Sequence, residues 1–253
     1  MFPLLQIENL SVDFVTDYGS TSAIKNISID INKGEIVAIV GESGSGKTVT
    51  SLSILQLLQS PPAKYASGQI LFSKDGSKQT DLLTLSEQQM REIRGNEIAM
   101  IFQEPMTSLN PVQTCGSQVM EAIVLHEKVA KSEARKKTIK LFEQVQLPDP
   151  ANMLDRYPHQ LSGGQKQRVM IAMAMSCNPS LLIADEPTTA LDVTVQKTIL
   201  QLIKKLQEQH QMGVIYITHD LSLVAEIADK VMVMYKGSVV EAGTVKDIFL
   251  QAQ

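Results

Sequence analysis

The chain has 253 residues, of which 43% are hydrophobic and 20% charged, a balance typical of a globular protein rather than a disordered one. Its net charge of −4 gives no general support for nucleic-acid binding, and two cysteines are too few for a disulfide framework. Residues 1–6 lack the basic and apolar regions of a secretion signal, so we expect none. The apolar run at 169–175 is far shorter than the roughly 18 residues of a membrane span. We expect a soluble protein of the cytoplasm.

The first half of the chain has the apolar patterns of strands. Residues 5–14 and 24–31 alternate between apolar and polar side chains, which predicts two half-buried antiparallel strands. The unbroken apolar run at 36–40 predicts a strand that is buried on both faces. The other elements expected here are a helix at 48–58, a hairpin over 60–80 that turns at 74–77, and a buried strand at 98–102.

In the second half, charged helical sequence precedes a return of the strand pattern. The stretch from about 113 to 161 predicts a helical insertion between strands. Apolar runs at 181–184, 214–217 and 231–234 predict buried strands, the first two followed by helices, and residues 248–253 are helix-like. This alternation predicts an α/β fold with a largely parallel sheet.

The strongest motif, G-x-x-x-x-G-K-[ST], follows the predicted strand at 36–40 and opens a helix. Its glycines would let backbone N–H groups face phosphate oxygens, and the helix N-terminus would add partial positive charge. Lys47 would reach the β- and γ-phosphates, and the Thr48 hydroxyl would bind Mg²⁺. The alternative is a glycine-rich turn that binds nothing. The motif comprises Gly41, Glu42, Ser43, Gly44, Ser45, Gly46, Lys47 and Thr48.

Two acids, Asp185 and Glu186, end the apolar strand predicted at 181–184. At the carboxyl edge of a parallel sheet they would face phosphates bound at the neighbouring strand. Asp185 is placed to hold Mg²⁺, and Glu186 to orient or deprotonate the attacking water. The alternative is that both acids only cap the helix that follows.

A second helix start carries Ser162 and Gln165 at the spacing of a capping box, with Gly163 and Gly164 between them. Capping alone would explain the serine and the glutamine. The two glycines would also expose N–H groups at a helix N-terminus, which indicates a second anion site. Because the chain has one set of predicted magnesium ligands, this second site could serve a nucleotide held by another copy.

These motifs resemble those of the ATP-binding subunit or domain of ABC transporters, and the resemblance covers essentially the whole chain. It identifies 41–48 as Walker A, 161–165 as the signature and 181–185 as Walker B. Gln103, in the sequence IFQEP, matches the Q-loop, and ALD at 190–192 matches the D-loop. The motifs occur in the order of the family.

The resemblance assigns roles to three residues whose local sequence is weak evidence alone. Gln103 would bind magnesium and water in a loop that senses a membrane partner, although a glutamine after a strand is usually a surface residue. His219 would contact the γ-phosphate and position Glu186, although a lone histidine is more often structural. Asp192 would make a contact across a dimer, although it could simply cap a helix.

Adenine recognition is assigned by spacing. In the family an aromatic ring before the second strand stacks on the base, and Tyr18, 23 residues before Gly41, matches that position. Phe14 is the competing residue, but its alternation with Val12 favours a place in the core.

The fold implied by the resemblance is a P-loop NTPase cassette. It has a RecA-like parallel-sheet core, an N-terminal antiparallel β subdomain and an inserted α-helical subdomain. We expect a single ATP-binding domain over 1–253, with 1–112 and 177–253 forming the nucleotide-binding core and β subdomain. The helical signature subdomain would span about 113–176.

The function implied is an ATPase, with ATP and Mg²⁺ as cofactors, that powers a transporter by ATP-driven dimer closure. The expected partners are a second cassette, identical or different, transmembrane permease subunits and indirectly a solute-binding protein, with no nucleic acid. The expected location is the cytoplasmic face of the cell (inner) membrane, as a peripheral subunit.

Local sequences narrow the branch of the family. The stretches at 41–50, 100–111, 157–160 and 185–196 resemble importers of dipeptides, oligopeptides, nickel or glutathione. Many members of that branch continue past the equivalent of Phe249, so we expect a short subunit, a shortened chain or the first half of a tandem ATPase. The alternatives are an ABC exporter, an ABC protein that transports nothing, and a small-molecule kinase, which would not explain the signature.

Overall fold

The computed structural model describes the chain except for Tyr18, 104–107, Ala190, 251–253 and the side chain of Leu250. The chain forms two compact units. One comprises residues 1–91 and 211–253, and the other comprises residues 92–210. From the sequence we expect different boundaries, with a core and β subdomain at 1–112 and 177–253 and a helical subdomain at about 113–176. That division stays a prediction.

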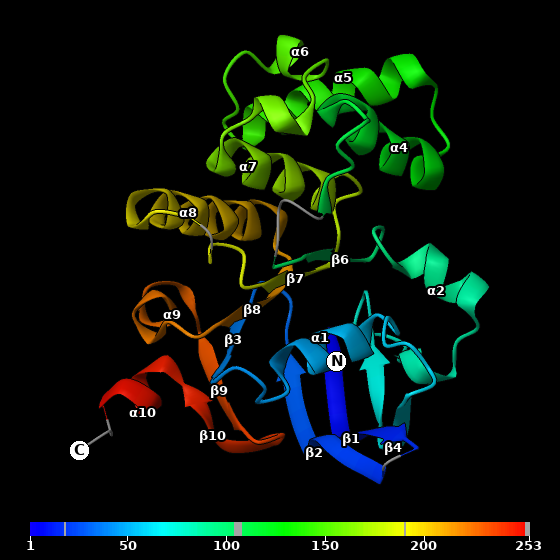
Figure 1. Cartoon of the computed structure of the whole chain (residues 1–253), viewed down its shortest axis with the longest axis vertical. Helices are drawn as coiled ribbons and strands as arrows, with labels where there is room; N and C mark the ends of the chain where they lie inside the picture. The colour runs from blue at the N-terminus through cyan, green and yellow to red at the C-terminus, as the bar shows by residue number, and fades with distance from the viewer. Residues whose placement is uncertain (18, 104–107, 190, 251–253) are drawn as a thin grey trace. The chain divides into compact units, whose positions relative to one another are not determined.

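The first unit contains an antiparallel sheet with the strand order β2-β1-β4-β5 (Figure 1). Apolar residues of both strands are buried on one face, which covers a core, but shifts in the β1–β2 register interrupt the predicted alternation. The buried residues are Leu5, Ile7, Leu10 and Val12 of β1 and Ile24, Ile27 and Ile31 of β2. The expected hairpin over 60–80 forms only at its end, where Leu71 and Phe72 pair with β5, and most of β4 pairs with β1 instead. The strands are β1 (Leu5–Thr16), β2 (Gly19–Ile31), β4 (Ala63–Phe72) and β5 (Thr80–Asp81).

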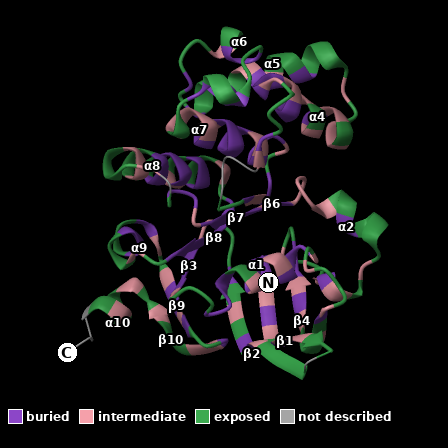
Figure 2. Ribbon diagram, viewed as in Figure 1, coloured by how far each residue is buried: buried purple, intermediate pink, exposed green. Residues whose placement is uncertain are grey.

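The same unit contains the parallel strands that carry the glycine-rich loop. Strand β3 (Ile36–Gly41) lies between β8 (Gly213–Thr218) and β9 (Lys230–Tyr235) and is parallel to both. Strand β10 (Ser238–Thr244) pairs antiparallel with β9. Residues 36–40 of β3 and all of β8 are buried, as the purple ribbon of Figure 2 shows, which confirms the strands predicted from the unbroken apolar runs.

The helices of this unit follow its strands. Helix α1 (Lys47–Ile54) follows β3, α9 (Leu221–Ile227) follows β8, and α10 (Val245–Leu250) follows β10. The last of these confirms part of the helix-like stretch expected at 248–253, whose final three residues lie outside the described chain. A 3₁₀ turn, η1 (Leu82–Thr84), and α2 (Glu87–Ile93) lead toward the second unit.

The helix expected at 48–58 is shorter than predicted, because α1 ends at Ile54. Gln56 adopts a left-handed conformation with φ 49°, and its N–H donates to the Ser53 carbonyl at 3.1 Å. The Leu57 N–H donates to the Leu52 carbonyl at 2.9 Å. These two bonds form a Schellman motif, which ends a helix while the apolar spacing continues.

The second unit contains two parallel strands and the helical insertion. Strand β6 (Ile98–Ile101) pairs in parallel with β7 (Leu181–Asp185), which is buried throughout, as predicted. No helix in the described part of the chain is long and apolar enough to cross a membrane. The helices of the unit are α4 (Cys115–Glu127), α5 (Lys131–Gln144), α6 (Pro150–Met153), α7 (Gly163–Ala174) and α8 (Val193–His210), with the 3₁₀ turn η2 (Pro158–Gln160) before α7.

The two cysteines are free thiols in different environments. Cys115 is fully buried, and burial raises the pKa of its thiol to about 11. Cys177 is half-buried, and burial also raises the pKa of its thiol. Because the thiolate is the reactive form, we expect Cys115 to resist alkylation near pH 8 in the folded chain. Mass spectrometry after iodoacetamide treatment should find Cys177 modified first and Cys115 only after urea unfolding; equal labelling of the folded chain would contradict this.

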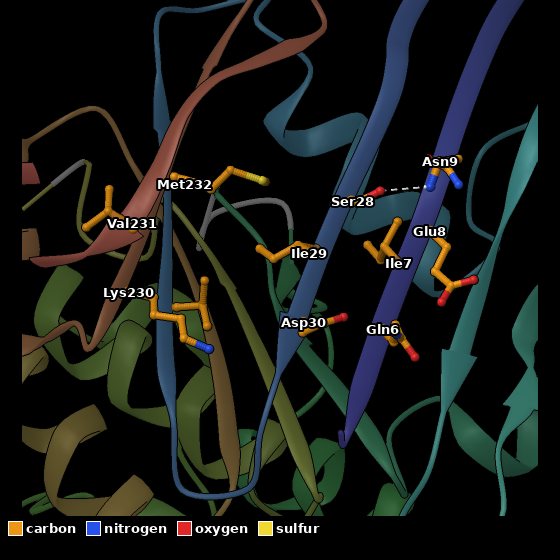
Figure 3. A pocket seen from close by; sticks show the side chains of 13 residues that line it. Gln6, Ile7, Glu8, Asn9, Ser28, Ile29, Asp30, Lys230, Val231 and Met232 are labelled. Carbon is orange, nitrogen blue, oxygen red and sulfur yellow. Dashed lines mark hydrogen bonds between the residues drawn. The ribbon is translucent and has the colours of Figure 1, made fainter. Parts of the chain in front are cut away.

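A cavity of about 610 Å³ opens in the first unit between β1 and β2 on one side and β3, β9 and β10 on the other (Figure 3). None of the predicted site residues lines it. Several of its polar groups have partners within the same unit. Lys230 Nζ lies 2.7 Å from Glu35 Oε1, Gln79 donates to Gln6 at 3.0 Å, and the Asn9 N–H donates to the Ser28 hydroxyl at 3.0 Å. The cavity is therefore separate from the nucleotide-binding motifs.

Candidate nucleotide-binding and hydrolysis site

The loop between β3 and α1 has a shape that only glycine permits at two positions. A Cβ added to Gly41, at φ +157°, would lie 2.2 Å from the Met234 carbonyl oxygen. A Cβ on Gly46, at φ +104°, would lie 2.8 Å from the Ala23 carbonyl oxygen. Both glycines are therefore fixed by neighbouring backbone as well as by conformation.

The Lys47 side chain forms hydrogen bonds with the backbone of this loop. Its side chain is buried, and Nζ donates to the carbonyl oxygens of Gly41 at 2.8 Å and Glu42 at 3.0 Å. An ammonium group has three donors, so one remains for a ligand. Buried positive charge at a helix N-terminus is the chemistry that binds phosphate.

Two hydroxyl groups of the loop support this assignment. The Ser45 hydroxyl is buried and has no hydrogen-bond partner among the described residues. Thr48 exposes its side chain in the first turn of α1, and no hydrogen bond joins its hydroxyl to another part of the described chain. Because buried polar groups are normally satisfied, the loop fits an anionic ligand that would supply the missing partner.

His219 lies beside the same loop. It contributes with Gly41 and Glu42 to the lining of a cavity of about 480 Å³ within the first unit. Asp220 accepts hydrogen bonds from the Ser222 hydroxyl at 2.6 Å and the Ser222 N–H at 2.9 Å, and the hydroxyl bond is the main reason why the pKa of its carboxyl is lowered. Asp220 thereby caps α9 and fixes the backbone directly after His219.

In the second unit, Asp185 and Glu186 end β7 as predicted. Asp185 is buried, and Glu186 is half-buried with a left-handed backbone at φ +45°. The Gln103 side-chain amide donates to Glu186 Oε2 at 3.1 Å, so the predicted Q-loop glutamine contacts the predicted base directly. The Thr189 hydroxyl donates to the same oxygen at 2.9 Å. Sequence reasoning did not select Thr189, and its only signal is the spacing of three residues from Glu186.

The helix after these acids is capped by a different residue. Asp192 Oδ1 accepts the Val195 N–H at 3.0 Å at the start of α8. The capping alternative considered for Asp185 and Glu186 is therefore wrong, because Asp192 fills that role. Whether Asp192 also makes a contact across a dimer stays a prediction.

The signature segment begins α7 with the predicted capping box. The Ser162 hydroxyl accepts the Gln165 N–H at 3.3 Å, and Gln165 Oε1 accepts the Ser162 N–H at 3.1 Å. The glycines have a packing role that sequence reasoning missed. A Cβ on Gly163 would lie 3.3 Å from Leu191, and a Cβ on Gly164 would lie 3.0 Å from Val195.

The predicted residues thus fall into two groups. The phosphate loop and His219 belong to the first unit, and Gln103, 162–165, Asp185, Glu186 and Asp192 belong to the second. Tyr18, the predicted adenine-stacking residue, lies outside the described residues, as does Ala190 of the D-loop. Its competitor Phe14 is half-buried in β1.

A buried strand that enters a glycine loop with a buried lysine, and a second strand that ends in paired acids, define a P-loop ATP-binding cassette. The chain belongs to the ABC transporter family, whose model matches residues 24–189. This match confirms the family predicted from the sequence.

Relatives place the chain within a branch of that family. It is 53% identical over 249 residues to the glutathione import ATP-binding protein GsiA of Escherichia coli (strain K12) and 52% identical over 246 residues to that of Shigella boydii serotype 4. Each match covers 97% of this chain and 40% of the relative. The chain thus spans less than half the length of these curated relatives.

Solved structures share the fold. A dimeric post-hydrolysis state of the ATP-binding cassette MJ0796 bound to ADP and Pi aligns with a TM-score of 0.83 at 28% identity, covering 95% of this chain and 98% of that one. The cbiO1 subunit from Clostridium perfringens, part of the ABC transporter complex cbiONQ, aligns with a TM-score of 0.80 at 29% identity, covering 99% and 92%. These matches confirm the predicted cassette fold.

Proposed function

We propose that the chain is the ATP-hydrolysing cassette of an importer for glutathione or a closely related small peptide. The observation that carries this proposal is the 53% identity to a glutathione import ATP-binding protein across 97% of the chain. The stretches that favoured peptide, nickel or glutathione importers are spread over the same length, which supports the same branch.

In this proposal the loop at 41–48 binds the triphosphate of ATP. The free donor of Lys47 would contact the β- and γ-phosphates, and the backbone N–H groups of the loop would surround them. Thr48, Gln103 and Asp185 would hold Mg²⁺ through a hydroxyl, an amide and a carboxylate oxygen, which are the ligand types it prefers. Bound Mg²⁺ would neutralise the negative charge that develops during phosphoryl transfer.

Glu186 acts as the general base for hydrolysis. It accepts a proton from water as the water oxygen bonds to the γ-phosphorus and the bond to the β–γ bridging oxygen breaks, which releases ADP and phosphate. The contact from Gln103 orients the Glu186 carboxylate. His219, placed beside Gly41 and Glu42, would donate to the γ-phosphate.

Two cassettes complete each site. The N-terminus of α7, with Ser162 and Gly164, offers N–H groups and a hydroxyl to the γ-phosphate of a nucleotide held by the other cassette. MJ0796, which shares the fold, forms a dimer. ATP would then hold two cassettes together until it is hydrolysed.

The membrane partner would bind the second unit next to Gln103. Phe102 is 42% exposed there and lines a cavity of about 370 Å³ with Met100, Met170 and Met173. Apolar, methionine-rich surface suits a protein partner. A permease helix at this cavity would couple transport to the Gln103 loop and would place the cassette at the cytoplasmic face of the membrane.

Uptake by proteoliposomes that contain the cassette with its candidate permease and solute-binding protein tests the proposal. We expect labelled glutathione to accumulate only with internal ATP, and unlabelled glutathione to compete better than Ni²⁺ or an unrelated tripeptide. ATP hydrolysis without glutathione uptake, in the presence of active nickel or dipeptide uptake, would overturn the assigned cargo.

A further inference from the structure

Thr189 contacts the carboxylate that the proposed function makes the general base. Its hydroxyl donates to Glu186 Oε2 at 2.9 Å and lies 3.3 Å from the Glu186 carbonyl oxygen. We propose that Thr189 is a positioning residue that holds the Glu186 carboxylate in its productive orientation, an inference that rests on the proposed ATPase. A hydroxyl has one hydrogen, and the shorter distance assigns it to the carboxylate.

The backbone from Glu186 to Thr189 forms a short turn that brings the two side chains together. Glu186 has a left-handed conformation at φ +45°, which is uncommon for a residue with a side chain. The Thr189 N–H lies 3.4 Å from the Glu186 carbonyl oxygen across the same short turn. Thr189 therefore closes the turn with its backbone and orients the carboxylate with its side chain.

Helix α8 anchors the turn from outside. The Gln196 side-chain amide donates to the Thr188 carbonyl oxygen at 3.0 Å, and the Leu191 N–H donates to the same oxygen at 3.1 Å. Thr189, which bonds Glu186, therefore directly follows a residue whose carbonyl group is fixed by α8. Anchoring the turn in this way restricts the conformations of the Glu186 side chain without any contact with substrate.

Gln103 and Thr189 hold the same carboxylate oxygen from different segments. Gln103 follows β6, whereas Thr189 follows β7. In the proposed function Gln103 becomes a ligand of Mg²⁺ when nucleotide binds, so its contact with Glu186 changes during the cycle. Thr189 belongs to the same turn as Glu186 and can keep its hydrogen bond throughout. The two donors therefore differ in role, and Thr189 is the permanent one.

The test compares steady-state ATP hydrolysis by four forms of the full chain: the natural chain, Thr189→Val, Thr189→Ser and Thr198→Val. Thr189→Val keeps the shape of the side chain and removes the donor, so we expect kcat to fall roughly tenfold, with KM for ATP changed less than about twofold. Thr189→Ser keeps the donor and should restore kcat. Thr198 is exposed, and among the described residues its hydroxyl bonds only the Thr194 carbonyl oxygen in α8. Thr198→Val is therefore the matched control and should match the natural chain.

A second set of variants separates positioning from a general structural role. In a Glu186→Gln background, adding Thr189→Val should cause no further loss of kcat, because the carboxylate that it positions is absent. Natural kcat in Thr189→Val, equal losses in Thr189→Val and Thr189→Ser, or an additional tenfold loss in the double variant would each overturn the inference. Absence of ATPase activity in the natural chain would instead overturn the proposed function.

Discussion

Replacing Glu186 by glutamine should lower ATP turnover by a factor on the order of 10² to 10⁴ while ATP binding is retained. Glutamine is nearly the same shape as glutamate but cannot accept a proton from the attacking water. Gln103 and Thr189 can still donate to the remaining carbonyl oxygen, so the local turn should persist. Single-turnover hydrolysis and equilibrium binding of a fluorescent ATP analogue measure the two quantities separately.

The matched control for this variant is Glu226→Gln on α9. It also replaces one carboxylate by an amide, but Glu226 lies in the other unit and belongs to none of the predicted motifs. It should hydrolyse ATP at the natural rate. Turnover by Glu186→Gln within about threefold of the natural chain would remove Glu186 from the role of general base.

Replacing Lys47 by alanine should weaken ATP binding roughly 100-fold, because a charge-assisted contact with the phosphates is lost. The substitution also removes the bonds to the Gly41 and Glu42 carbonyl oxygens that shape the loop. We therefore expect a lower melting temperature as well as weaker binding. Isothermal titration with ATP and thermal denaturation measure these effects.

Lys33→Ala provides the comparison, because Lys33 is an exposed lysine in the turn before β3. It should bind ATP like the natural chain. Unchanged ATP affinity in Lys47→Ala would contradict the assignment of the loop at 41–48 as the phosphate site.

The sequence predicts the elements that are decided by burial and local conformation. Strands β3, β7 and β8 are buried on both faces, so their unbroken apolar runs are distinctive. The capping box of Ser162 and Gln165 is likewise a local pattern with one structural outcome. These features carry most of the fold and the positions of the main motifs.

The features that the sequence does not predict depend on contacts between distant segments. Strand β4 pairs along most of its length with β1, which is distant in the chain, and only Leu71 and Phe72 pair with β5. Helix α1 ends in a Schellman motif although its apolar spacing continues to Leu57. The spacing of three residues between Glu186 and Thr189 acquires meaning only with the left-handed backbone of Glu186, which no residue type announces.

The residues of the candidate site could be predicted from the sequence, but the tertiary contacts among them could not. The glycine loop, the paired acids and the helix N-terminus can be read from the sequence because phosphate binding requires particular residue types at fixed spacing. The close approach of Gly163 to Leu191 and Gly164 to Val195, in contrast, depends on how the start of α7 packs against the start of α8 and the turn before it. A side chain at either position would require the neighbouring side chain to shift by a few tenths of an ångström.

Sedimentation equilibrium of the Glu186→Gln variant, with and without Mg²⁺ and ATP, tests most directly whether a nucleotide joins two cassettes. We expect a monomer without ATP and a particle of twice the mass at saturating ATP. Adding Ser162→Arg to the same variant should leave ATP bound to monomers, because the bulky side chain would block the N-terminus of α7. Monomers of Glu186→Gln at full ATP occupancy, or dimers unaffected by Ser162→Arg, would contradict the shared site.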